Sequence, residues 1–95
     1  MKLNAIKSHL TSMDSIINFG NAKSEDYFNR GTLKQAIEDD YGALKDFNKS
    51  IELDNKHFGS LVNKSVIHLK QKKIADALSE MNALIKMCPD SALLY

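Results

Sequence analysis

The sequence predicts an all-α protein made of tandem helix pairs, with about five helices in one domain. The main observation is a spacing: four apolar positions each occur three times at one fixed interval of about 34 residues. These positions are Leu10, Leu44 and Leu78; Met13, Phe47 and Met81; Ile17, Ile51 and Ile85; and Phe19, Leu53 and Met87. A repeat of this length is typical of two helices joined by a turn. One proline and four glycines in 95 residues also favour long helices over a strand-rich fold.

The composition is that of a small globular domain. Of the 95 residues, 43% are apolar and 26% are charged, so we expect a single folded unit. The net charge of +1 provides no strong field for nucleic acid or an anionic membrane, and neither is expected as a partner. No stretch approaches the ~20 apolar residues that span a bilayer, and the first residues lack the apolar core of a secretory signal. With Cys88 as its single cysteine, the chain is expected in the cytoplasm.

Apolar residues at steps of three and four, and the stops between them, place each helix. The expected helices span residues 2–19, 24–37, 41–53, 58–71 and 74–87. Gly20 ends the first helix, and Ser24 offers a side-chain cap to the second. Asp39 and Asp40 break the second helix and cap the third. The chain is therefore expected to turn after every helix, as a helical repeat does.

The second helix of each expected pair carries an alanine four residues before a large apolar residue. Followed by a proline that closes the unit, this pattern resembles the tetratricopeptide repeat. It is found as Ala43 and Phe47, with Asn55 in place of the proline, and again as Ala77 and Pro89, with Met81 in place of the family's aromatic residue. The segment from Tyr27 to Gly31 is similar to the opening of the same repeat, with Arg30 where leucine is usual. Lys34 and His68 stand where the family has a tyrosine.

The resemblance covers two full repeats, residues 24–57 and 58–91, within a single domain of residues 1–95. Residues 2–20 resemble the second helix of a preceding repeat, and residues 92–95 the start of an incomplete further helix. The family implies an α-solenoid of antiparallel helix pairs that winds into a right-handed superhelix. It also implies a protein-binding scaffold with no cofactor.

By the resemblance, the concave face is lined by the first helix of each pair and binds a peptide or a helix. The candidate contacts are Phe28, Asn29, Thr32, Gln35, Val62, Asn63, Val66 and Leu69. The alternative for each residue is that it packs against a neighbouring helix or faces solvent without a ligand. One subset of the family holds a C-terminal carboxylate with lysine, arginine and asparagine, but only its asparagines, as Asn29 and Asn63, have counterparts here. An apolar groove suits an extended segment or an amphipathic helix better.

No catalytic, metal or cofactor site is expected. His9, His57 and His68 are widely separated and lack the spacing of a zinc site. Cys88 lies in a turn without a motif that would mark it as a nucleophile. The basic run from Lys70 to Lys73 is interpreted as a solvated helix end, where cations are favoured by the helix dipole.

The expected C-terminal end of the array is apolar and incomplete. The residues expected to face a neighbour there are Met81, Leu84, Ile85, Leu93, Leu94 and Tyr95. Two explanations stay open: the chain is part of a longer array, or another copy covers this end as a homo-oligomer. The second explanation gives an alternative function, a structural assembly element that self-associates through this end.

Overall fold

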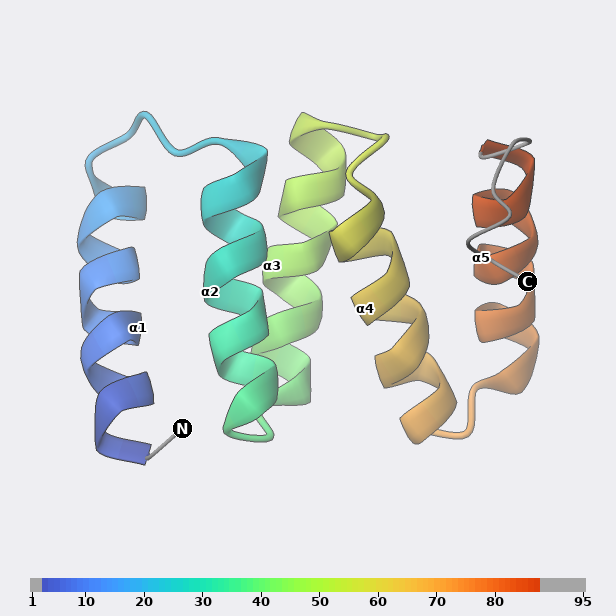
Figure 1. Ribbon diagram of the computed structural model, residues 1–95, viewed down its shortest axis with the longest axis horizontal. Helices are drawn as coiled ribbons and strands as arrows, with labels where there is room; N and C mark the ends of the chain where they lie inside the picture. The colour runs from blue at the N-terminus through green and yellow to red at the C-terminus, as the bar shows by residue number, and fades with distance from the viewer. Residues whose placement is uncertain (1–2, 88–95) are drawn as a thin grey trace.

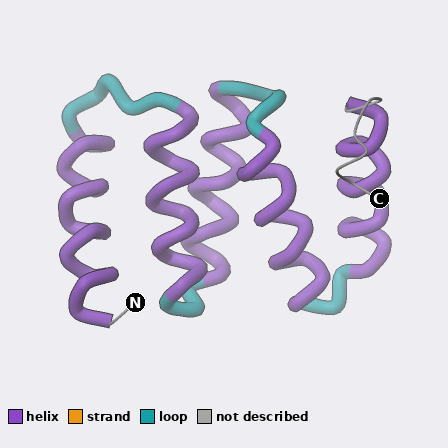
Figure 2. Tube along the Cα trace, in the orientation of Figure 1, coloured by secondary structure: helices purple, strands orange, loops and turns teal. Residues whose placement is uncertain are grey.

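The computed structural model describes residues 3–87, and these form five helices. The helices are α1 (Leu3–Asn18), α2 (Ser24–Ala36), α3 (Asp40–Leu53), α4 (Phe58–Lys70) and α5 (Ile74–Met87). No strand occurs within residues 3–87, so the predicted all-α class is confirmed. The predicted helix ranges agree with these bounds to within one residue at each end. The chain reverses direction at each loop, and consecutive helices lie beside one another (Figures 1 and 2).

Side-chain caps account for the starts of α3 and α4. Asp39 is the N-cap of α3, and its Oδ1 accepts a hydrogen bond of 3.1 Å from the Gly42 amide, as the sequence predicts. The prediction for Ser24 is wrong: Lys23 is the N-cap of α2, and the Ser24 hydroxyl donates instead to the Ser50 carbonyl at 2.8 Å. Ser24 is already the first helical residue, one position past the cap, and its hydroxyl is used to join α2 to α3.

The two turns that join α2 to α3 and α4 to α5 have the same backbone geometry. Glu38 and Lys72, which stand one period apart, both adopt left-handed conformations, with φ of 65° and 62°. In each turn the following amide reaches back five residues, from Asp39 to the Lys34 carbonyl at 2.9 Å and correspondingly in the second turn at 2.8 Å. Non-glycine residues adopt this conformation at a cost, so its recurrence shows that the period extends to the backbone.

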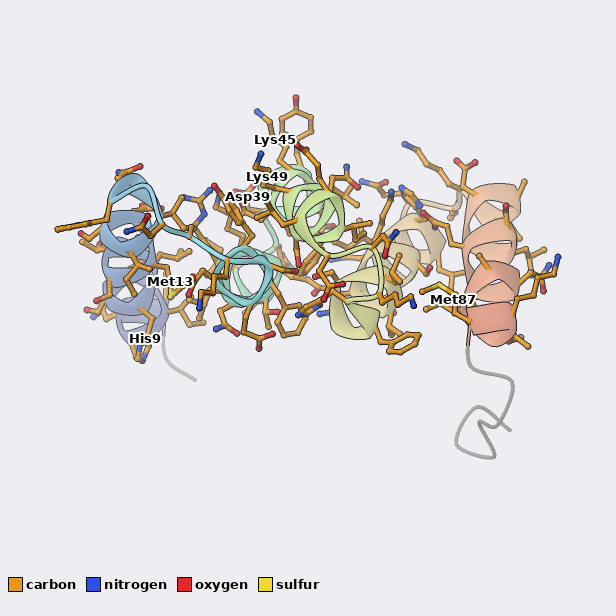
Figure 3. All side chains as sticks on the ribbon, turned by 90° about the horizontal axis from the view of Figure 1, so that it is seen from above. His9, Met13, Asp39, Lys45, Lys49 and Met87 are labelled. Atoms are coloured by element: carbon orange, nitrogen blue, oxygen red, sulfur yellow. The ribbon has the colours of Figure 1, made fainter. Side chains whose placement is uncertain are left out.

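The core lies where α2, α3 and α4 meet. Ala43 and Phe47 of α3 and Ile67 of α4 are fully buried there. Gly31 of α2 faces the Phe47 ring so closely that a Cβ at this position would lie 2.7 Å from it. The absence of a side chain therefore sets the spacing between α2 and α3. Viewed along the helices, α2 and α4 lie on one side of the molecule and α3 on the other (Figure 3).

The four periodic apolar positions differ in burial. Phe47 is fully buried, whereas its counterparts Met13 and Met81 are half-buried. The last set is at the surface: Phe19 is 87% exposed, and Leu53 and Met87 are also exposed. Recurrence of an apolar residue therefore marks the register of the repeat and not always its core. None of the five described helices combines the length and apolar character that crossing a membrane requires.

Candidate functional site

A groove lies between α1 and α2 at three of the predicted contact residues. It has a volume of about 370 Å³. Its lining consists of His9, Ser12, Met13, Phe28, Asn29, Thr32 and Leu33. Met13 and Leu33 provide an apolar floor, while Asn29 and Thr32 are exposed polar residues. His9 points to the side of the molecule on which α2 and α4 lie (Figure 3), so the groove opens on that side.

A row of exposed apolar side chains follows α4. Phe58, Val62, Val66 and Leu69 are each between 40% and 43% exposed. Their spacing of four, four and three residues places them on one face of the helix. Three of the four are among the predicted contact residues. We call these four residues the α4 row. Isolated exposed apolar residues are ordinary, but a row on one helix face is typical of a surface that binds another chain.

Phe28 connects the groove to α4 and is partly a core residue. Its ring is half-buried, lies 6.1 Å from the Phe47 ring and 4.9 Å from the His57 ring, and packs over Gly59. Of the remaining predicted contacts, Gln35 and Asn63 are half-buried. The surface that is accessible to a ligand is therefore formed by Asn29 and Thr32 of α2 together with the α4 row.

Arg30 forms an ion-pair cluster that the sequence pattern does not predict. Its Nε and Nη2 donate to the two carboxylate oxygens of Asp46 at 2.8 and 2.7 Å, and its Nη1 donates to Asp14 at 2.9 Å. Lys34 Nζ lies 3.1 Å from Asp46, whose side chain is 4% exposed. The hydrogen bond and charge of Asp46 raise the pKa of Arg30 above its ordinary value, against the opposing effect of burial. One guanidinium thus joins α1, α2 and α3.

A second cluster occupies the equivalent place one period later. Glu80 of α5 accepts at 2.7 Å from Nδ1 of His68, and its other oxygen lies 3.8 Å from Lys64 Nζ. The correspondence is complete for three positions: Arg30 with Lys64, Lys34 with His68, and Asp46 with Glu80. The sequence does contain a signal for these two clusters. Their basic and acidic residues recur at the same 34-residue interval as the apolar positions.

A chain of hydroxyls and one imidazole links α2, α3 and α4. The Ser60 hydroxyl donates to the Ser50 hydroxyl at 2.7 Å, and both side chains are fully buried. His57 caps α4 by accepting from the Ser60 amide through Nδ1, so its Nε2 carries the proton and donates to Glu25 at 2.7 Å. Serine, histidine and carboxylate are close together here, but the Ser60 hydroxyl donates to Ser50 and not to the imidazole. The arrangement fixes three helices and leaves Ser60 without a general base.

The structure also bears on the basic run from Lys70 to Lys73 and on possible metal ligands. Lys70 Nζ lies 3.2 Å from Asp40 Oδ2, so this lysine pairs with α3. Among residues 3–87, no three histidine, cysteine, aspartate or glutamate side chains come together in a way that could hold a metal ion.

The residues predicted to form the C-terminal face differ in exposure. Leu84 is only 6% exposed, so it is more buried than the other described residues of this predicted face. Ile85 is 48% exposed, and Met81 is half-buried. Together with Val62 these residues line a cavity of about 190 Å³. Leu93, Leu94 and Tyr95, predicted to extend this face, lie outside the described residues, as does Cys88.

No protein-family model, curated protein or solved structure matches this chain. Its function is therefore inferred from the residues and their geometry.

Proposed function

We propose that this protein is a tetratricopeptide-type interaction module in which the helix pairs form a short right-handed solenoid. The period of the sequence supports this architecture at three levels: the apolar positions, the left-handed turns at Glu38 and Lys72, and the paired charges around Asp46 and Glu80. Agreement among backbone, core and charge is expected for true structural repeats and not for a chance recurrence of apolar residues.

The proposed binding face is the surface of α2 and α4. The observation that carries the proposal is the α4 row, four apolar residues exposed on one helix face beside the α1–α2 groove. An extended peptide or an amphipathic helix would place apolar side chains against this row and into the groove. Asn29 and Thr32 would then provide hydrogen bonds at the rim, where both are exposed.

We further propose that the protein binds its partner without catalysis and acts in the cytoplasm. The polar clusters support binding without catalysis, because Asp46, Glu80 and His57 each bond to a neighbouring helix and stabilise the fold. The single cysteine of the chain fits a reducing compartment.

Peptides selected from a displayed random library against the full chain would test the binding face. Val66→Lys adds a charge at a half-exposed position of the α4 row without removing a core side chain, and we expect it to weaken the selected peptides at least tenfold. Phe28 is a poor choice for this test because it also packs against the core. Lys45→Ser, on the opposite side of the molecule (Figure 3), is the control. Unchanged affinity in Val66→Lys would contradict the proposal.

A second candidate function is self-assembly through the α5 end. It is favoured by the exposed apolar side chains of Leu78 and Ile85, on one face of α5. Sedimentation at micromolar concentration tests it: a single species of 10.7 kDa at all concentrations would exclude this alternative.

A further inference from the structure

Within residues 3–87, α1 is packed less closely than the helices of the first pair. It lies at one edge of the molecule and packs against α2 (Figure 1). Ile6 is the one buried residue among its 16, whereas α3 buries Ala43, Asp46, Phe47 and Ser50. Because α1 buries little apolar surface, separating α1 from α2 costs less free energy than separating α2 from α3.

One ion pair connects α1 to the rest of the described chain. Asp14 Oδ1 accepts from Arg30 Nη1 at 2.9 Å, and no other side-chain hydrogen bond or ion pair among residues 3–87 joins α1 to another helix. The Asp14 side chain is 54% exposed, and the Nε and Nη2 atoms of Arg30 bond to Asp46. The pair of Asp14 and Arg30, which we call the latch, can therefore open without disturbing the buried contact between Arg30 and Asp46.

The connection between α1 and α2 has the properties of a hinge. Gly20 has a φ of 95°, a conformation that glycine adopts without strain, and apart from its chain neighbours no heavy atom lies within 4 Å of the place where a Cβ would stand. Phe19 and Asn21 on either side are exposed. The turn from α2 to α3, in contrast, is closed by the hydrogen bond from the Asp39 amide to the Lys34 carbonyl. A rotation at Gly20 would thus redirect α1 with few contacts of the connection to break.

The helix α1 provides one wall of the groove. His9, Ser12 and Met13 belong to α1, and the other lining residues belong to α2. The volume of about 370 Å³ between the two walls shows that the helices do not fill the space at this point. A small change in the direction of α1 would therefore change the width of the groove.

We propose that α1 is a hinged wall of the groove, which pivots at Gly20 and closes on the bound peptide, with the latch holding the closed position. This inference rests on the proposed function and adds a conformational step to it. A peptide that contacts both walls binds only while α1 is attached to α2, so binding stabilises the closed position. Attachment of α1 favours binding by the same factor, because the two equilibria are linked.

Amide hydrogen exchange of the free chain, followed residue by residue by NMR, tests the hinge. A helix of 16 residues is marginally stable in water on its own, so each opening of α1 exposes its amides. We expect the protected amides of α1 to exchange about tenfold faster than those of α2 and α3. Equal protection in the three helices would overturn the proposal.

The latch is tested by Asp14→Asn, which keeps the size of the side chain and removes its charge. This variant is expected to speed exchange in α1 about threefold and to leave exchange in α2 and α3 unchanged. The matched control is Glu52→Gln, because the ion pair of Glu52 with Lys49 is also exposed but lies within α3. If Asp14→Asn leaves α1 unchanged, or if the control has an equal effect on α1, the proposal fails.

The coupling to binding is measured with the library peptides selected for the proposed function. A saturating peptide is expected to slow exchange in α1 about tenfold. Ile6→Asp places a charge in the buried contact between α1 and α2, outside the groove, and should weaken these peptides about tenfold. Circular dichroism shows whether the loss of helix is confined to α1. If Ile6→Asp unfolds the whole chain, Ile6→Ala replaces it, with an expected weakening of about threefold.

Failure of the hinge and failure of the proposed function give different results. If Val66→Lys leaves the affinity of the selected peptides unchanged, the proposed function is contradicted. If Val66→Lys weakens the peptides but a saturating peptide does not slow exchange in α1, the wall of the groove is fixed and only the hinge is overturned.

Discussion

The two helix pairs α2–α3 and α4–α5 share one pattern of residues but differ in how firmly it is packed. In the first pair, Asp46 is 4% exposed at its side chain and holds Arg30 through two short hydrogen bonds of 2.8 and 2.7 Å. In the second pair, Glu80 is 22% exposed, and its lysine partner lies 3.8 Å away. The same positions thus carry a buried bidentate pair in one unit and a looser, more hydrated pair in the other.

The difference follows from what covers each pair. Within residues 3–87, α4 packs over the first pair and closes its core around Phe47. No described helix lies beyond the second pair, where Met81 takes the place of Phe47 and stays half-buried. In a repeat array each unit is stabilised largely by its neighbours, so stability is expected to decrease toward α5.

The largest effect is expected from truncating the core residue of each unit. Phe47→Ala removes a fully buried ring and should lower the free energy of unfolding by about 3–5 kcal/mol. A loss of this size is enough to unfold much of a small domain. Met81→Ala removes a half-buried side chain and should cost about 1–2 kcal/mol. Urea denaturation followed by circular dichroism at the helix band measures both. Equal losses would show that the second unit is packed as closely as the first.

The acidic residue of each cluster gives the next largest effect. Asp46→Asn replaces an acceptor oxygen by an amide whose hydrogens face the donors of Arg30 and Lys34, and it should cost about 1.5–3 kcal/mol. The matched change Glu80→Gln, at a more exposed cluster, should cost less than about 1 kcal/mol. The same denaturation experiment compares them. A larger loss for Glu80→Gln would reverse the proposed order of the two units.

The helix bounds could be predicted from the sequence because apolar spacing and helix stops are local signals. Asp39 caps α3 as predicted, since the amide that it accepts from is three residues away in the chain. Ser24 does not cap α2, because the helix begins one residue earlier than predicted from the cap, with Lys23 at the N-cap and Ser24 bonded to Ser50 of α3. The spacing of apolar residues could not predict that Phe19 is exposed and Leu84 is buried, because burial depends on how the helices pack against one another.

The charged clusters illustrate a different limit. In the sequence, Arg30 and Lys34 are only departures from the tetratricopeptide pattern that the chain resembles. The structure shows that the two departures belong together, since both cations bond to the carboxylate of Asp46. A buried carboxylate requires compensating partners, and Arg30 and Lys34 provide them to Asp46 from α2. The sequence predicts a candidate binding surface on one face of α2 and α4. It does not predict which residues of that face are buried in the core and which are exposed.

The smallest expected effect is a gain in the second unit. Lys64→Arg would supply a planar guanidinium able to bond both oxygens of Glu80, as Arg30 does with Asp46, and should stabilise the fold by about 0.2–1 kcal/mol. Lys49→Arg is the control, because its pair with Glu52 is exposed and should leave the midpoint of urea denaturation unchanged. An increase in the midpoint for Lys64→Arg alone would show that the looser pair in the second unit results from the choice of cation. If the midpoint does not increase, the looser pair in the second unit results instead from the greater exposure of Glu80. A hydrated carboxylate gains little from a better-matched partner.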